Sequence, residues 1–161
     1  MKTNKKQSFS KKELKEFNKI IAPFLICNHE DGLYSLLLYE DNKYERAFVE
    51  CQKLPNNSVK LGYPKGNGYD FEALMKKFLS ETMPEDAFNQ SIESTKLKVE
   101  FLRGESSENS DKLVYDSEAG MFCVYSKNRE KLMKLAVEFK KMCDDTSQLK
   151  ELISHINFRE D

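Results

Sequence analysis

The run from Gly62 to Phe71 (Gly-Tyr-Pro-Lys-Gly-Asn-Gly-Tyr-Asp-Phe) constrains the fold more than any other stretch of this chain. It holds three of the six glycines and one of the four prolines. Because glycine and proline interrupt helices and strands, no regular element can pass through this run. It therefore separates a first third with β-like patterning from a helix, and Asp70 is the predicted N-cap of that helix.

Three interpretations of this run remain open. A phosphate-binding loop would end in Gly-Lys-Ser/Thr, whereas Gly68 is followed by Tyr69 and Asp70, whose carboxylate would fill the helix N-terminus. A structural turn needs glycine where the backbone adopts positive φ or packs closely. A partner-binding loop would use Tyr63 and Tyr69, since exposed tyrosines on a rigid loop are good contact residues. The pattern favours the structural turn.

Length and composition predict a single folded domain. The chain has 161 residues, of which 39% are hydrophobic and 33% charged, and its eleven Phe and seven Tyr are too many for a disordered chain. The formal net charge of -1 indicates neither a nucleic-acid binder nor a mimic of one. We expect residues 1–10 to be a flexible, lysine-rich tail and residues 11–161 to form one α+β domain.

Hydrophobic periodicity predicts strands, then a helix, then strands and two C-terminal helices. Ser10 and Glu13 form a capping-box pattern before a short amphipathic turn. The expected strands are Ile20–Cys27, Leu33–Tyr39, Val59–Leu61, Leu97–Leu102, Leu113–Tyr115 and Met121–Tyr125, and the first two form a hairpin. The expected helices are Tyr44–Cys51, the segment after Asp70, the segment capped by Asn128, and one starting near Asp145 or Thr146. The predicted fold is an α+β domain with a mainly antiparallel sheet of about five or six strands covered by helices.

Candidate catalytic chemistry is sparse. The four cysteines (Cys27, Cys51, Cys123 and Cys143) lie far apart without a Cys-x-x-Cys pair, which indicates small buried side chains in a reducing compartment rather than a zinc site. Cys27 and His29 can share a face of a strand, but no third group is placed to orient the histidine. The sequence therefore predicts no catalytic, metal-binding or cofactor-binding residues.

The same patterning bears on location and partners. The lysine-rich start followed by Ile20–Cys27 is not a signal peptide pattern, because Glu13 and Glu16 precede the apolar run and Pro23 interrupts it. No stretch reaches the roughly 20 apolar residues of a membrane helix. We expect a cytoplasmic protein with no membrane partner. Acidic pairs in the predicted turns, such as Glu30-Asp31 and Glu40-Asp41, are exposed polar residues that can also face a basic partner.

Three segments resemble the immunity protein 51 family of bacterial polymorphic-toxin systems. They are Pro23–Cys27 with Tyr34–Leu38, Gly66–Leu74, and Asp116–Ser126 followed by a long helix, and together they extend from about Ile20 to Cys143. The chain departs from the family pattern at Phe71, where we associate a Trp, and its polar loop Gly104–Asp111 is an elaboration.

The resemblance implies a small cytoplasmic protein that is not an enzyme. It would bind a cognate toxin domain encoded by a neighbouring gene and neutralise it sterically. The candidate toxin-binding residues are Tyr63, Asn67, Tyr69, Glu30, Asp31 and Glu118. The rival interpretations are a small-molecule or nucleotide-binding enzyme that uses the Gly62–Asp70 loop, and an unrelated adaptor domain.

Overall fold

The computed structural model describes residues 10–30, 32–51, 66–82, 95–103 and 112–156. The described elements follow the chain in the order α1(Lys11–Ile21), β1(Leu25–Asn28), β2(Tyr34–Tyr39), α2(Glu45–Cys51), α3(Gly68–Thr82), α4(Thr95–Leu102), β3(Val114–Tyr115), β4(Met121–Ser126), α5(Arg129–Asp144) and α6(Thr146–Ser154). The predicted α+β class with an antiparallel sheet and C-terminal helices is confirmed. The predicted strand Val59–Leu61 and the Gly104–Asp111 loop lie outside the described residues.

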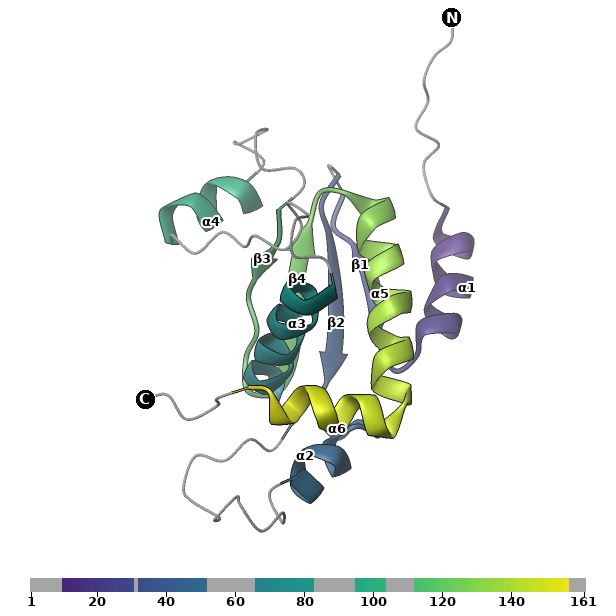
Figure 1. Cartoon of the computed structure of the whole chain (residues 1–161). Helices are drawn as coiled ribbons and strands as arrows, with labels where there is room; N and C mark the ends of the chain where they lie inside the picture. Colours follow the sequence, from purple (N-terminus) through teal and green to yellow (C-terminus); the bar gives the residue numbers. More distant parts are fainter. Residues whose placement is uncertain (1–9, 31, 52–65, 83–94, 104–111, 157–161) are drawn as a thin grey trace, which may run out of the picture.

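One antiparallel sheet organises the molecule, in the order β1-β2-β4-β3 (Figure 1). The predicted hairpin is confirmed, with Cys27 opposite Ser35. The centre of the sheet pairs β2 with β4 over their full lengths, from Tyr34 opposite Ser126 to Tyr39 opposite Met121. The described residues contain four of the six expected strands, because Leu97–Leu102 belongs to a helix and Val59–Leu61 lies outside the described residues.

That helix is α4, where the sequence predicted the strand Leu97–Leu102. The prediction placed Val99 and Phe101 on one face. In the structure Phe101 is fully buried while Val99 is 39% exposed. Residues two apart lie on opposite sides of a helix, so this pattern follows from helical geometry. Phe101 packs with Val114 on the face of the sheet away from the main core.

The N-terminal segment also differs from its prediction. The expected strand from Ile20 begins only at Leu25, because α1 continues to Ile21. Its capping box is complete, since the Glu13 backbone N–H donates to the Ser10 hydroxyl at 3.0 Å and the Ser10 backbone N–H donates to the Glu13 carboxylate at 2.9 Å. A well-capped helix extends until the residue before Pro23, where the proline ring disfavours helical geometry.

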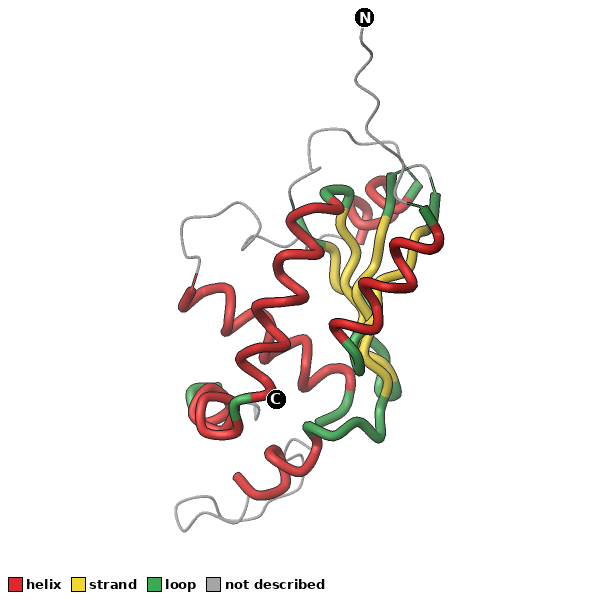
Figure 2. The backbone as a smooth tube through the Cα atoms, turned by 90° about the vertical axis from the view of Figure 1, so that its right-hand side faces the viewer, coloured by secondary structure: helices red, strands yellow, loops and turns green. Residues whose placement is uncertain are grey.

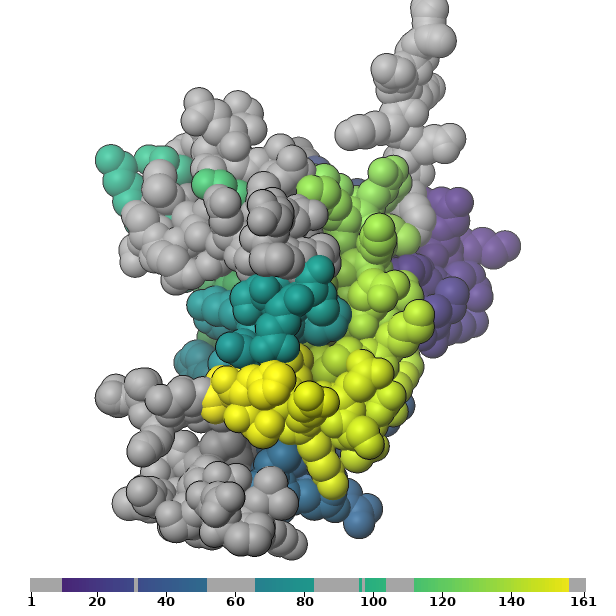
Figure 3. All heavy atoms as spheres, viewed as in Figure 1, coloured from purple at the N-terminus to yellow at the C-terminus, as the bar shows by residue number. Residues whose placement is uncertain are grey.

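The main core lies between one face of the sheet and the helices (Figure 2). Figure 3 shows α3, α5 and α6 side by side on that side of the molecule. The apolar stripe of α5 is buried: Leu132, Leu135, Ala136, Phe139, Met142 and Cys143. Asn128 caps α5 as predicted, and α6 starts at Thr146, within the predicted range, with Asp145 as its N-cap. Residues Ser35 to Leu38 of β2 are all buried, so this strand is covered on both faces.

Candidate functional site

The end of the sheet where β2 stops and β4 starts brings three distant segments together. The Glu40 backbone N–H donates to the Gly120 carbonyl at 3.0 Å, and the Gly68 N–H donates to the Ala119 carbonyl at 3.0 Å. We call residues 39–42, 67–70 and 116–120 the sheet-end surface. It contains Asn67, Tyr69 and Glu118 among the candidate residues. Tyr69 and Glu118 are exposed, and Asn67 is half-buried.

The remaining candidate residues are not part of this surface. Glu30 lies in the β1–β2 turn, at the opposite end of β2 from Tyr39, and is exposed with a φ of 70°. Its backbone N–H donates to the Asn28 side chain at 2.8 Å. Asp31 and Tyr63 lie outside the described residues. The structure therefore groups Asn67, Tyr69 and Glu118 and separates Glu30 from them.

Gly68 explains why α3 can start against the turn of the β3–β4 hairpin. A Cβ atom built on Gly68 would lie 1.9 Å from the Glu118 carbonyl oxygen and 2.4 Å from the Met121 carbonyl oxygen. No side chain fits there, so only glycine allows the backbone of α3 to approach this turn. Gly66 has a φ of 88°, which meets the expectation that this run needs positive φ. The described part of this run, Gly66 to Phe71, is therefore a structural turn that leads into α3.

The start of α3 corrects one prediction. Asp70 is not the N-cap, because the helix already begins at Gly68. Asn67 has the capping role, since its side-chain oxygen accepts the Asp70 backbone N–H at 2.9 Å. In return, the Asp70 carboxylate accepts the N–H groups of Gly66 at 2.9 Å and of Asn67 at 3.1 Å. Asn67 and Asp70 therefore have the reciprocal hydrogen bonds of a capping box. The sequence suggested Asp70 instead of Asn67 as the cap because both residue types are good N-caps.

This capping arrangement opposes the nucleotide-binding interpretation. A phosphate at a helix N-terminus needs free backbone N–H donors. Here the N–H groups of Gly66 and Asn67 already donate to Asp70, and the Gly68 N–H donates to Ala119. A second anion would also meet the Asp70 charge. In the described part of the loop, the Asp70 carboxylate therefore takes the position that a phosphate would need.

The cysteine and histidine side chains form no activated nucleophile. Burial raises the pKa of the Cys27 thiol, although a Ser35 hydrogen bond opposes this, and burial raises the pKa of Cys123 to about 12. A thiol with a raised pKa is a poor nucleophile at neutral pH. His29 hydrogen-bonds the buried Ser35 hydroxyl at 2.7 Å instead of being fully solvated. All four cysteines are free, and no group of three His, Cys, Asp or Glu in the described residues could hold a metal ion.

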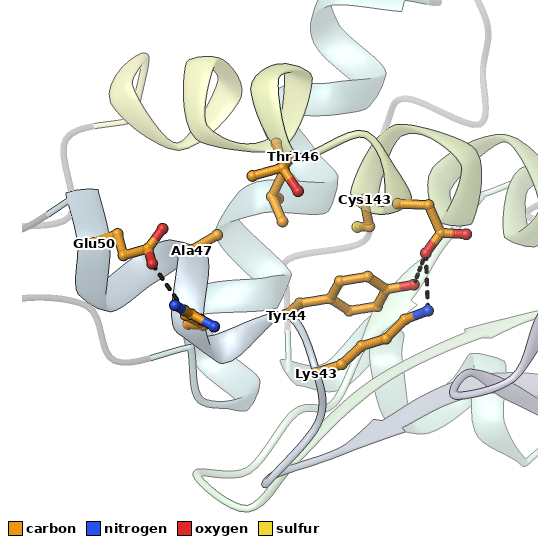
Figure 4. Close-up of a pocket in the computed structure, with 9 residues that line it drawn as sticks. Lys43, Tyr44, Ala47, Glu50, Cys143 and Thr146 are labelled. Atoms are coloured by element: carbon orange, nitrogen blue, oxygen red, sulfur yellow. Dashed lines mark hydrogen bonds and ion pairs between the residues drawn. The ribbon is translucent and has the colours of Figure 1, made fainter.

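A cavity of about 330 Å³ lies beside the sheet-end surface, between α2, α5 and α6 (Figure 4). Ala47, Cys143 and Leu149 supply apolar lining, and Thr146, the exposed first residue of α6, also lines the cavity. Figure 4 shows the Tyr44 ring reaching from the start of α2 toward the end of α5.

Hydrogen bonds and ion pairs connect the residues that line this cavity. The Tyr44 hydroxyl donates to Asp144 at 2.7 Å, and the Lys43 ammonium lies 3.2 Å from the same carboxylate. Partial burial opposes ionisation of Asp144, but hydrogen bonds from Lys140, Tyr44 and Lys43 outweigh it and lower its pKa. On the other wall, Glu50 pairs with Arg46 and with Lys150. Asn42 links cavity and sheet end, because its side chain bonds both the Tyr39 carbonyl and the Tyr44 N–H.

Sequence reasoning missed several residues of this region. The sequence indicated that the acidic pair Glu40-Asp41 can face a basic partner, but it did not mark these two as candidate contact residues and indicated no contact role for Tyr39 or Asp116. Pairing the Leu33–Tyr39 and Met121–Tyr125 strands would have placed Glu40 next to the 116–120 turn. Nothing in the sequence signals the contact between Tyr44 and Asp144, because they are a hundred positions apart in the chain.

Comparison with known proteins identifies one family. Residues 89–157 match the family model of immunity protein 51. This segment holds α4, β3, β4, α5 and α6, and it includes the Asp116–Ser126 motif, while the two earlier motifs precede it. No curated protein and no solved structure shows significant similarity to the chain. None of the described helices is long and apolar enough to cross a membrane.

Immunity proteins are typically not enzymes, and this match is consistent with the sequence-based prediction of a non-enzymatic protein. The resemblance that the sequence motifs indicated is therefore confirmed: over residues 89–157 the chain is similar to the immunity protein 51 family.

Proposed function

We propose that this protein is a toxin-neutralising immunity protein that binds the toxic domain of a polymorphic toxin in the cytoplasm and inhibits it sterically. The observation that carries the proposal is the match of residues 89–157 to immunity protein 51. The partner would be the toxin domain encoded by the neighbouring gene. Binding without chemistry on the toxin is consistent with the raised pKa values of the Cys27 and Cys123 thiols.

The proposed contact residues fall into two groups. Asn67, Tyr69 and Glu118 lie on the sheet-end surface, and Tyr63 precedes Asn67 by four positions in sequence. Glu30 and its sequence neighbour Asp31 belong to the turn at the other end of β2. The capped turn fixes the backbone of Asn67 and Tyr69 before any partner binds, so these two residues lose less conformational entropy on binding. We therefore propose Asn67, Tyr69 and Glu118 as the primary contact.

Co-expression tests the proposal. The toxin domain encoded beside this gene should stop growth of a heterologous host, and the wild-type protein should restore growth and co-purify with the toxin. A soluble wild-type protein that neither protects nor binds would contradict the proposed function. Neutralisation by contact also predicts that toxin released from the complex by denaturation and refolded alone regains its activity. Permanent loss of toxin activity would instead indicate covalent inactivation.

A further inference from the structure

We propose that the sheet-end surface docks a basic face of the toxin domain, and that the neighbouring α2–α5–α6 cavity receives a side chain protruding from that face. The inference rests on the proposed function and deepens it by stating the charge and shape of the partner. Three independent features support it: unpaired acidic charge, exposed tyrosines on fixed backbone, and an adjoining preformed cavity.

The charge of the surface is of one sign. Its three segments carry five acidic residues and no Lys, Arg or His: Glu40, Asp41, Asp70, Asp116 and Glu118. Four of these side chains are exposed, and only Asp70 is half-buried. Elsewhere in the described residues many carboxylates have ion pairs, as Glu50, Glu72 and Asp144 do. No described cation forms a salt bridge with Glu40, Asp116 or Glu118, so their charge is available to attract a cationic protein surface.

The aromatic residues supply the contact area. Tyr39 is 54% exposed and Tyr69 is 56% exposed. Tyrosine buries a large ring at low entropic cost and retains a hydroxyl for hydrogen bonding, which makes it a frequent hot-spot residue. Tyr39 is held by pairing with Met121, and Tyr69 lies in the first turn of α3 between the capping residues Asn67 and Asp70. Both rings therefore start from a fixed backbone.

The cavity gives the surface a concave neighbour. Residues 39–42 lead directly into Lys43 and Tyr44, which line it. Its volume of about 330 Å³ exceeds that of any single amino-acid side chain and is at the lower end of the range for ligand sites. Its two carboxylates already have cationic partners, so its apolar lining is the part that a partner can newly cover. A buried anchor beside a charged surface is the usual layout of a tight interface.

Kinetic binding measurements on the full chain test whether the acidic charge of the sheet-end surface accelerates association. The probe is the toxin domain from the neighbouring gene, at low and high salt. The triple variant Glu40→Gln/Asp116→Asn/Glu118→Gln should slow association by about tenfold or more at low salt and flatten the salt dependence. The matched control Glu130→Gln/Glu138→Gln/Glu151→Gln removes the same number of charges from exposed positions of α5 and α6 and should associate faster than the triple variant.

Two further variants test the contact itself. Tyr69→Ala should raise the dissociation rate by about tenfold or more. Thr146→Trp, which puts a large side chain on an exposed lining residue of the cavity, should weaken binding more than Thr146→Ala. Wild-type binding with equal rates for the acidic triple variant and its control would overturn this inference while leaving the proposed function intact. Failure of the wild type to bind would overturn both. Self-association of the free protein that the triple variant abolishes would assign the surface to a second copy instead.

Discussion

Gly68 is the residue at which helix and sheet come into backbone contact. An alanine inside a helix is normally favoured over glycine by about 1 kcal/mol. Here the added methyl group would overlap two backbone carbonyl oxygens, at 1.9 and 2.4 Å, and neither can rotate away. Steric overlap therefore outweighs helix propensity at this position, because the whole start of α3 or the 118–121 turn must shift to make room.

We predict that Gly68→Ala lowers the free energy of unfolding by about 1–3 kcal/mol, the usual cost of overpacking. Chemical denaturation measures the change. Gly120→Ala is the matched control, since a Cβ there approaches nothing closer than 3.7 Å. Equal stability of the two variants would show that α3 does not start against the hairpin turn.

Asp144 makes stability depend on pH. Its pKa is lowered in the folded protein, so folding favours the ionised form. The stabilisation is present above the unfolded pKa of about 3.9 and is lost as the pH falls through the lower folded pKa. We predict that the difference in unfolding free energy between wild type and Asp144→Asn narrows from about pH 6 to about pH 3. A difference that is independent of pH would mean that the Tyr44 and lysine contacts do not favour the carboxylate.

At the level of elements, sequence patterning succeeded where one periodicity dominated and failed where two were possible. The α5 stripe has six apolar residues at helical spacing, and all six are buried. The segment Thr-Lys-Leu-Lys-Val-Glu-Phe-Leu fits either a strand or a helix, and only the packing of Phe101 on Val114 distinguishes them. Short segments of this kind acquire their structure from tertiary contacts that no local window contains.

The α5–α6 junction depends on one side chain. The Asp145 carboxylate accepts the backbone N–H groups of Ser147 and Gln148, and its own N–H donates to the Met142 carbonyl. We predict that Asp145→Ala lowers the unfolding free energy by about 1 kcal/mol. Asp145→Asn should lower it by much less, because asparagine is also a good N-cap. Thermal and chemical denaturation test this pair. A loss as large in Asp145→Asn as in Asp145→Ala would exclude a capping role.

At the level of the whole molecule, an aromatic cluster joins the layers. The Phe139 ring on α5 contacts Phe24 before β1, Phe78 on α3 and Phe122 on β4, with ring centroids 5.4–6.4 Å apart. The helical spacing of Phe139 in the apolar stripe of α5 is typical of a core residue, but it does not indicate which elements meet there. The four rings come from four separate parts of the chain, so only the three-dimensional arrangement identifies which of them meet.

We predict that Phe139→Ala costs about 3–5 kcal/mol, a large part of the 5–15 kcal/mol typical of a domain. Val137→Ala, at a position 39% exposed on the same helix, should cost much less. Equilibrium denaturation of the two variants compares them directly. Similar decreases of the unfolding free energy in the two variants would show that Phe139 is not at the centre of the core.

The pairing of β2 with β4 also determines when, during synthesis of the chain, the sheet-end surface can form. The central strand Tyr34–Tyr39 can pair with β1 early in synthesis, but it meets β4 only after Met121–Ser126 has emerged from the ribosome. Until then, the turn that carries Glu118 and supports the start of α3 has no sheet to extend. Nascent and prematurely terminated chains that lack β4 therefore have no sheet-end surface. Under the proposed function, only chains synthesised beyond β4 can protect the cell from the toxin.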